Sequence, residues 1–162
     1  MSAIKIGQGY DVHAFTRGDG IVLGGVSIPF NRSLLAHSDG DVLIHALCDA
    51  LLGALGRGDI GRLFADDREE NRNRDSREFL REIRQLLDEE GYQLGNADIT
   101  VIAQAPRISP HSDAMTVILA EDLDCEVGQI NIKATTTEKL GFTGREEGIA
   151  VQAVVLLVAS CA

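Results

Sequence analysis

The stretch GDVLIHALCDALLGAL, residues 40–55, predicts a long and mostly apolar helix. Its apolar side chains recur at helical spacing, at Leu43, Leu47, Ala50 and Ala54. We expect Ser38 or Asp39 to cap the first turn, because short polar side chains accept the free N–H groups there. The segments on either side predict the sheet that accompanies this helix.

Strand patterns precede the helix. Residues 3–15 begin with Ile4 and Ile6 alternating against Lys5, which predicts a first strand. Residues 21–23 and 26–28 are joined through two glycines and predict a short hairpin.

A second helix with clear ends follows. Asp75 to Glu78 has the form of a capping box, and Gly91 is a natural stop. The apolar stripe between them consists of Phe79, Ile83, Leu86 and Leu87.

The remaining segments complete the fold. Strands are predicted over 99–103, 130–134 and 149–158, and a third helix over 115–123. The order of elements indicates an α+β fold, a single-layer mixed β-sheet with helices packed on one face. Because no internal repeat is present, we expect residues 1–162 to form one domain.

The composition excludes several classes of protein. A hydrophobic share of 44% over 162 residues suffices for one compact core and excludes a disordered chain. A formal net charge of -10 argues against a nucleic-acid partner, which would require clustered Lys and Arg. An acidic protein that binds a phosphorylated substrate needs local cations, which favours a metal site.

Neither a membrane span nor a signal peptide is predicted. The longest apolar run, near residues 153–159, is too short to cross a bilayer. The N-terminus goes straight into a strand-like pattern. The three cysteines are odd in number and unrelated in spacing, so reduced thiols in a cytosolic protein are the simplest account.

The first candidate site combines a strand and a helix. Asp11 and His13 lie two apart in the first strand, so their side chains point to the same side. His45 lies on the first helix between Asp41 and Asp49, each one turn away. Two His and one carboxylate can hold zinc with a fourth position open, and Asp49 could orient the His45 ring. The alternative is an ordinary strand end and a partly buried helical His.

The second candidate site is the threonine run within Lys133–Glu138. Because Thr favours strands, a plain strand face is the alternative. The run leads into the turn-rich Gly141–Arg145, where hydroxyls, amides and an Arg suit phosphate oxygens. Glu138 could hold an oxygen-preferring cation such as magnesium.

Two short segments flank the first helix. Leu35–Asp41 precedes it, where a helix N-terminus favours an anion, although a plain cap explains every residue except His37. Gly58–Gly61 follows it and needs no function as a turn after a helix. The polar segment 64–75 is either a solvated loop or a lid over a site.

Together these segments resemble the 2-C-methyl-D-erythritol 2,4-cyclodiphosphate synthases. The resemblance covers essentially the whole chain in the family's order, at Gly9–Phe15, Leu35–His45, Asp59–Gly61 and Lys133–Gly148. The segment IKATTTEKLGF, residues 132–142, is close to diagnostic.

The resemblance implies a phosphorus–oxygen lyase of the non-mevalonate isoprenoid pathway. The substrate would be 4-diphosphocytidyl-2-C-methyl-D-erythritol 2-phosphate. Its 2-phosphate would attack the β-phosphorus, close 2-C-methyl-D-erythritol 2,4-cyclodiphosphate and release CMP. Since no covalent enzyme intermediate is implied, catalysis would rest on positioning and charge neutralisation.

The resemblance also implies two cation sites. Asp11, His13 and His45 would ligate zinc, whose open position takes a β-phosphate oxygen. Glu138 would contact a magnesium or manganese ion that bridges the α- and β-phosphates.

The remaining implied roles concern catalysis and substrate binding. His37 and Thr136 match positions expected to steady the transition state by hydrogen bonds. The substrate-binding residues implied are Asp11, His13, His37, Ser38, Asp59, Ile60, Gly61, Phe64, Asp66, Ala103, Ala105, Pro106, Arg107, Ser109, Thr135, Thr136, Thr137, Glu138, Phe142 and Arg145. Within this set, 59–61 and 66 would hold the methylerythritol part, and 103–109 and 135–138 the cytidine and phosphates.

Members of the family are homotrimers with sites between neighbouring subunits. We therefore expect a homotrimer in which a partner covers part of the sheet. Phe142, Arg145 and Glu147 match a segment near a cavity on the threefold axis, where an isoprenoid phosphate is a candidate ligand. The family also implies a location in the bacterial cytoplasm.

Three positions depart from the family's pattern. Ala65 stands where Pro is common, which removes a fixed φ and should loosen the loop. Arg107 stands where Lys is usual, and it keeps the charge, so we expect nucleotide binding to persist. Gln8 replaces a common His that is not a ligand.

Two other functions would use the same residues. A metal-dependent phosphohydrolase would use water as its nucleophile, but the candidate bases near the predicted zinc are Asp11 and Asp49, which have other predicted roles. A non-catalytic trimer that binds isoprenoid phosphates would be indicated by loss of a cation ligand, and all four are present.

Overall fold

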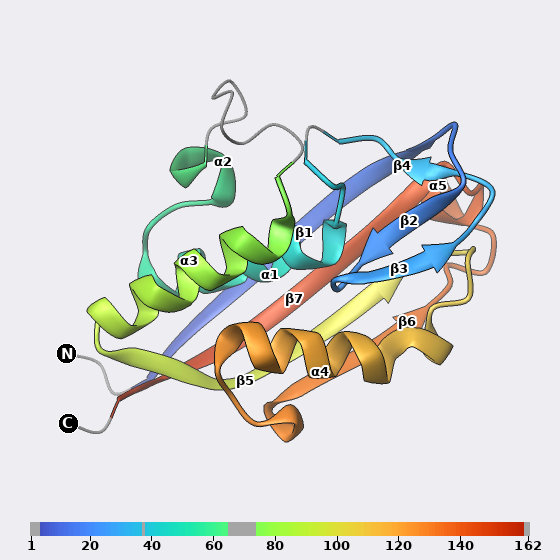
Figure 1. The fold of residues 1–162 in the computed structure, drawn as a ribbon. Helices are drawn as coiled ribbons and strands as arrows, with labels where there is room; N and C mark the ends of the chain where they lie inside the picture. Colours follow the sequence, from blue (N-terminus) through green and yellow to red (C-terminus); the bar gives the residue numbers. More distant parts are fainter. Residues whose placement is uncertain (1–3, 37, 65–73, 161–162) are drawn as a thin grey trace.

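A five-stranded mixed sheet forms the centre of the computed structural model, which describes residues 4–36, 38–64 and 74–160 (Figure 1). The strand order is β4-β1-β7-β5-β6. The bounds are β1 Ile4–Thr16, β4 Ser33–Leu34, β5 Tyr92–Ile102, β6 Ile130–Thr135 and β7 Gly148–Ala159. Strand β7 is antiparallel to β1 and β5, whereas β5 and β6 are parallel, so β1, β5 and β6 end at the same edge of the sheet.

Three long helices cover one face of this sheet (Figure 1). They are α1 Val42–Leu55, α3 Ser76–Glu89 and α4 Ser112–Leu123. Shorter elements are the hairpin β2 Gly20–Leu23 with β3 Val26–Pro29, the helical turns α2 Ile60–Leu63 and α5 Gly141–Gly144, and the 3-10 turns η2 Ser109–His111 and η3 Val127–Gln129. The predicted α+β fold with helices on a mixed sheet is confirmed. The sequence patterns missed β4 and the helical turns.

Helix α1 is the centre of the core. Leu43, Leu47 and Leu51 are fully buried. The helix lies close to β1 because two glycines face it: a Cβ on Gly9 would come within 1.9 Å of the Ala46 carbonyl oxygen. Only a residue without a side chain permits this approach.

The cap of α1 differs from the prediction. Asp41, which is fully buried, caps the helix by accepting the Ile44 N–H at 3.0 Å. Its carboxylate also accepts the N–H groups of Gly24 at 2.9 Å and Gly25 at 2.7 Å. The expectation that Ser38 or Asp39 caps the helix is therefore wrong.

Helix α3 begins at the predicted position, with Asp75 as its cap. The capping box is only half formed. Asp75 accepts the Arg77 N–H at 2.9 Å, whereas the Glu78 carboxylate pairs with Arg74 at 2.7 Å.

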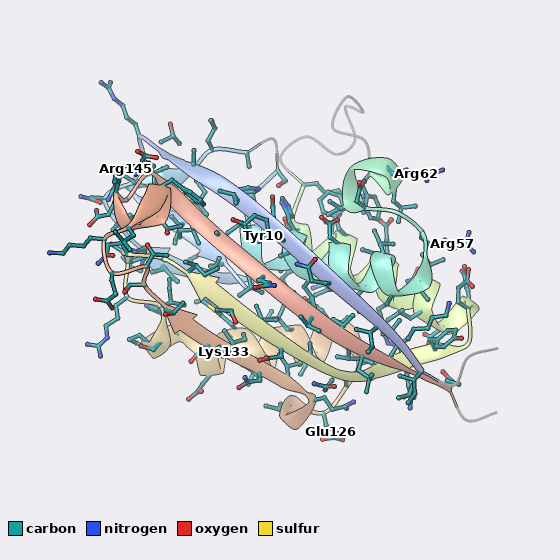
Figure 2. The ribbon with its side chains drawn as sticks, turned by 180° about the vertical axis from the view of Figure 1, so that it is seen from behind. Tyr10, Arg57, Arg62, Glu126, Lys133 and Arg145 are labelled. Carbon is teal, nitrogen blue, oxygen red and sulfur yellow. The ribbon has the colours of Figure 1, made fainter. Side chains whose placement is uncertain are left out.

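The face of the sheet away from the helices carries exposed apolar side chains, and Figure 2 shows Tyr10 on this face. We call it the outer face. Its exposed apolar residues are Ile4, Ile6, Tyr10, Val12 and Val154. Tyr10 is 53% exposed and Ile6 69%, so the described chain leaves this surface uncovered. In the described part of the chain, no helix has the length and apolar character needed to cross a membrane.

Candidate functional site

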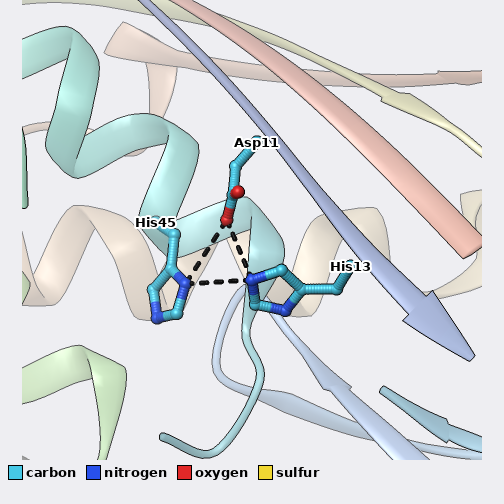
Figure 3. Close-up of side chains that lie close together, drawn as sticks. All are labelled: Asp11, His13 and His45. Atoms are coloured by element: carbon cyan, nitrogen blue, oxygen red, sulfur yellow. Dashed lines mark hydrogen bonds and ion pairs between the residues drawn. The ribbon is translucent and has the colours of Figure 1, made fainter. Parts of the chain in front are cut away.

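Three side chains converge where α1 crosses β1 (Figure 3). Asp11 Oδ2 lies 3.0 Å from His13 Nε2 and 3.4 Å from His45 Nδ1. The two ring nitrogens are 3.3 Å apart. Among the described residues, this is the group of His, Cys, Asp or Glu whose ligand atoms come close enough to hold one metal ion. The predicted meeting of these residues is confirmed.

A backbone carbonyl orients the His13 ring. His13 Nδ1 lies 3.0 Å from the Gly40 carbonyl oxygen, which can only accept a hydrogen bond. Nδ1 therefore carries a proton, and Nε2 faces Asp11 and His45. Gly40 lies just before α1, and His45 lies on the first turn of that helix. The start of α1 therefore positions both His13 and His45.

Ser76 contacts the His45 ring, in place of the predicted Asp49. His45 Nε2 lies 2.9 Å from Ser76 Oγ and 3.2 Å from Ser38 Oγ. The Asp49 carboxylate instead accepts the Ile60 N–H at 2.7 Å. The prediction that Asp49 orients the ring is wrong.

Ser76 was missed because it lies 31 residues from His45 and belongs to no local motif. The capping pattern at 75–78 marked only the start of a helix. No sequence signal linked that helix start to the first candidate site.

Asp11 and His13 stabilise each other's charged forms. Burial alone would raise the pKa of Asp11, but the neighbouring rings, chiefly that of His13, outweigh it and hold that pKa well below its usual range. Burial alone would lower the pKa of His13, but the hydrogen bond and charge of Asp11 raise it. In the metal-free chain these shifts favour an ionised Asp11 beside a protonated His13, and a carboxylate with two imidazoles is a donor set that fits a divalent cation.

A cavity of about 280 Å³ opens beside the three side chains. Predicted substrate-binding residues among its lining are Asp11, His13, Ser38, Ile60, Gly61 and Phe64. Asp59 is adjacent in sequence, but its carboxylate caps α2 by accepting the Arg62 N–H at 2.8 Å. His37, Ala65 and Asp66 lie outside the described residues.

A second cavity, of about 370 Å³, lies at the ends of β5 and β6. Its lining includes Ala103, Pro106, Arg107, Ser109, Thr135 and Thr136, all predicted to bind the nucleotide or phosphates. The described residues predicted to bind substrate that line neither cavity are Asp59, Ala105, Thr137, Glu138, Phe142 and Arg145.

Three of these residues lie in or after the turn that follows β6, where their side chains bond to neighbouring groups of the chain. Glu138 is exposed, and its Oε1 accepts the Thr136 hydroxyl at 3.3 Å. Thr137 donates its hydroxyl to the Leu140 carbonyl at 2.5 Å. Arg145 pairs with Glu147 at 2.8 Å.

A line of paired residues across the sheet gives the distance between the two cavities. Val12 pairs with Ala150, Ala150 with Ile102, and Ile102 with Thr135. Thr135 is therefore level with Val12, which lies between Asp11 and His13. Three strand spacings separate them, about 14 Å across the sheet. The cavities share one edge of the sheet but are distinct.

Comparison with known proteins identifies the family. A family model described as the YgbB family matches residues 4–158. The chain belongs to the YgbB family. The resemblance drawn from the motifs is thereby confirmed, and it extends over nearly the whole chain.

Two relatives show the extent of the likeness. Over 158 residues, the chain is 58% identical to the 2-C-methyl-D-erythritol 2,4-cyclodiphosphate synthase of Mannheimia succiniciproducens, covering 98% of this chain and 99% of the relative. It is 57% identical over 155 residues to the enzyme of the same name from Haemophilus influenzae, covering 96% and 98%.

Solved structures agree with the YgbB assignment. The bifunctional IspDF of Campylobacter jejuni matches with a TM-score of 0.92 and 47% identity, over 96% of this chain and 42% of that one. The CDP complex of IspF from Plasmodium falciparum matches with a TM-score of 0.88 and 40% identity, over 99% of both chains.

Proposed function

We propose that this chain is a cyclodiphosphate synthase of the non-mevalonate isoprenoid pathway. In this proposal the whole chain acts as one domain. It converts 4-diphosphocytidyl-2-C-methyl-D-erythritol 2-phosphate to 2-C-methyl-D-erythritol 2,4-cyclodiphosphate and CMP. The observation that carries the proposal is the convergence of Asp11, His13 and His45 on one cavity, in a chain so similar to relatives of that name.

The spacing of the three ligand atoms supports zinc. Around tetrahedral zinc with bonds of about 2.0–2.1 Å, neighbouring ligand atoms lie roughly 3.3 Å apart. The observed separations are 3.0, 3.4 and 3.3 Å. Bound there, zinc would act as a Lewis acid toward a β-phosphate oxygen in its open position.

The second cavity would bind the cytidine and phosphates. Arg107 lines it and supplies positive charge, while Thr136 supplies a hydroxyl for hydrogen bonds in the transition state. His37 would act with Thr136 in the same role. Glu138 would hold a magnesium or manganese ion beside the diphosphate.

In the first cavity, the methylerythritol part would lie against Ile60, Gly61 and Phe64, with Asp59 and Asp66 beside them. Its 2-phosphate then approaches the β-phosphorus next to the zinc ligands. Positioning of the two phosphates is the main catalytic contribution of the chain.

A homotrimer would bring two half-sites together. In one chain the cavities lie about 14 Å apart across the sheet. A neighbouring copy could place its second cavity opposite the first cavity of this chain. The uncovered outer face supports such an assembly, because Ile6, Tyr10 and Val12 are exposed there.

Further expectations follow from the family. In the trimer, Phe142 and Arg145 would lie near the threefold axis, where an isoprenoid phosphate is a candidate ligand. A bacterial cytoplasmic location also stays a prediction from the resemblance.

One observation favours a phosphohydrolase as the second candidate. The Asp49 carboxylate bonds to the Ile60 N–H rather than to the His45 ring, and it lines the first cavity. Burial and the charges of Asp59 and Asp11 raise its pKa. It is therefore available as a general base for water, and Asp49→Asn would abolish hydrolysis while sparing cyclisation.

The test is a phosphorus-31 NMR time course with substrate, zinc and magnesium. We expect a cyclic diphosphate and equimolar CMP, both blocked by a chelator. Inorganic phosphate or an open-chain product would support the hydrolase instead, and absence of turnover would support a binding protein.

A pair of histidine variants tests the metal ligands. His45→Ala should lose both zinc and cyclisation. His111→Ala, in η2 and outside both cavity linings, should retain zinc. Full activity of His45→Ala would contradict the assignment.

A further inference from the structure

We infer that Asp39 and Ser76 are positioning residues that keep the proton of the His45 ring on the side away from the cation. The inference rests on the proposed metal centre and adds two residues to it. The contacts join three segments: Asp39 before α1, His45 on α1, and Ser76 at the start of α3.

Asp39 can only accept hydrogen bonds in this arrangement. Its Oδ1 accepts the Asp41 N–H at 3.1 Å, and its Oδ2 accepts the Ser76 N–H at 3.0 Å. A carboxylate carries no proton to give in return. The Ser76 hydroxyl, 2.5 Å from Oδ1, must therefore donate to Asp39.

The direction of that bond decides the state of the His45 ring. Ser76 has one hydroxyl proton, and Asp39 receives it, so Ser76 Oγ accepts from His45 Nε2–H at 2.9 Å. A neutral ring with its proton on Nε2 has its lone pair on Nδ1. Nδ1 is the atom that faces Asp11 Oδ2 and His13 Nε2.

Burial prevents water from replacing the hydrogen bonds that link Asp39, Ser76 and His45. Ser76 is fully buried, so bulk water has no access to substitute for its hydroxyl. Ser38 Oγ also approaches His45 Nε2, but at the longer distance of 3.2 Å, and it already accepts the Gly40 N–H. We therefore expect Ser76 to dominate, with Ser38 as a secondary contact.

The first experiment measures zinc affinity of the metal-stripped full chain by competition with a chromophoric chelator, without substrate. Ser76→Ala keeps the backbone N–H bonded to Asp39 and removes only the hydroxyl. Loss of such a partner typically weakens metal affinity by about 10–100-fold, and we expect an effect in this range.

Two matched variants separate the ring contact from other effects. Asp75→Ala removes the cap of α3 but leaves the hydrogen bonds among Asp39, Ser76 and His45 in place. Its zinc affinity should therefore equal that of the wild type. Ser38→Ala should weaken zinc less than Ser76→Ala. The reverse order, with Ser76→Ala neutral, would show that Ser38 holds the ring and would overturn the inference.

A double variant tests the direction of the bonds. Asp39→Ala frees the Ser76 hydroxyl to donate to Nε2, which moves the ring proton to Nδ1, in the place of the cation. Asp39→Ala should therefore bind zinc more weakly than Ser76→Ala, and adding Ser76→Ala should restore part of the loss. If the two losses simply add, the residues act only through structure.

Nitrogen-15 NMR of the metal-free chain in mildly alkaline buffer reads the ring directly. The four histidines make assignment by single variants practical. We expect His45 to carry its proton on Nε2 in the wild type and in Asp75→Ala, and to show a mixture of both forms in Ser76→Ala. An unchanged spectrum in Ser76→Ala would refute the inference.

The outcomes also separate the inference from the proposed function. If the wild type binds no zinc, the metal centre and the inference fall together. If it binds zinc and Ser76→Ala binds equally well, only the positioning role is lost.

Discussion

Gly9 of β1 and Ala46 of α1 approach so closely that a Cβ on Gly9 would lie 1.9 Å from the Ala46 carbonyl oxygen. Ala46 follows His45 directly, and Gly9 precedes Asp11 by two residues. The separation of strand and helix at this point therefore sets the distance between two ligands of the candidate metal centre.

Gly9→Ala should push α1 away from β1. We expect a loss of about 1–3 kcal/mol of unfolding free energy from overpacking, together with weaker zinc binding. Gly53→Ala is the matched control. Gly53 lies on the α1 side of the same contact between strand and helix, and its Cβ would meet only the Gln8 carbonyl at 3.8 Å. This control should stabilise by about 0.5–1 kcal/mol. Urea denaturation and zinc titration check both; normal zinc binding in Gly9→Ala would contradict the spacing argument.

Asp41→Ala should leave three N–H groups unpaired, those of Gly24 and Ile44, which are buried, and that of Gly25, which is half-buried. A buried N–H group costs about 1–3 kcal/mol when left unpaired, so we expect a loss of at least about 2 kcal/mol. Asp75→Ala removes an exposed cap from α3 and should cost only about 1 kcal/mol. Urea midpoints compare the two; equal losses would show that the hairpin contacts of Asp41 contribute nothing.

The turn after β6 is strained, since Glu138 and Lys139 have φ of 53° and 66°. A Cβ on Gly144 would lie 2.2 Å from the Lys139 carbonyl carbon, so Gly144→Ala should displace this turn. We expect weaker manganese binding in the presence of CDP, measured by electron paramagnetic resonance, with zinc binding unchanged. Lys139→Gly relieves the strain and should stabilise by about 0.5–1 kcal/mol. Unchanged manganese affinity in Gly144→Ala would show that the turn does not bind the second cation.

The Asp11–His13 pair should give the metal-free chain a pH-dependent stability. The folded-state pKa of Asp11 is lowered, so its contribution is present above the ordinary value of 3.8 and is lost as the pH falls. The folded-state pKa of His13 is raised, so its contribution is complete below 6.5 and is lost as the pH rises further. The pair therefore stabilises most between these two values.

Urea denaturation in the presence of a chelator, repeated over a series of pH values, measures this effect. Asp11→Asn should reduce the decline above pH 6.5, because Asp11 makes the largest of the interactions that raise the pKa of His13, while those of Gly40 and Asp41 remain. An undiminished decline in Asp11→Asn would place its origin elsewhere.

Long periodic segments were predictable because burial follows their spacing. The alternation in β1 places Asp11 and His13 on one side, and the helical period places His45 on a polar stripe. That these two elements meet at the ligands depends on Gly9, and close approach of two backbones leaves no periodic signal in a sequence. The family resemblance supplied that part of the site.

Local spacing misled at two positions. Asp49 lies one turn after His45, but its carboxylate accepts the Ile60 N–H at the start of α2, a partner that helical spacing does not reveal. Ser38, Asp39 and Asp41 are all good capping residues by type. The hairpin decides between them, because its buried N–H groups also need the Asp41 carboxylate.

The two proposed cation sites rest on backbone of different rigidity. Asp11 and His13 belong to a strand paired with β7 from Ile4 to Ala14, and His45 lies on a buried helix. Glu138 stands on an exposed turn beyond the end of β6. Zinc should therefore remain with the protein through many turnovers, whereas the second cation should arrive and depart with the diphosphate that it neutralises. In steady-state kinetics the first would behave as a permanent part of the enzyme and the second as a co-substrate.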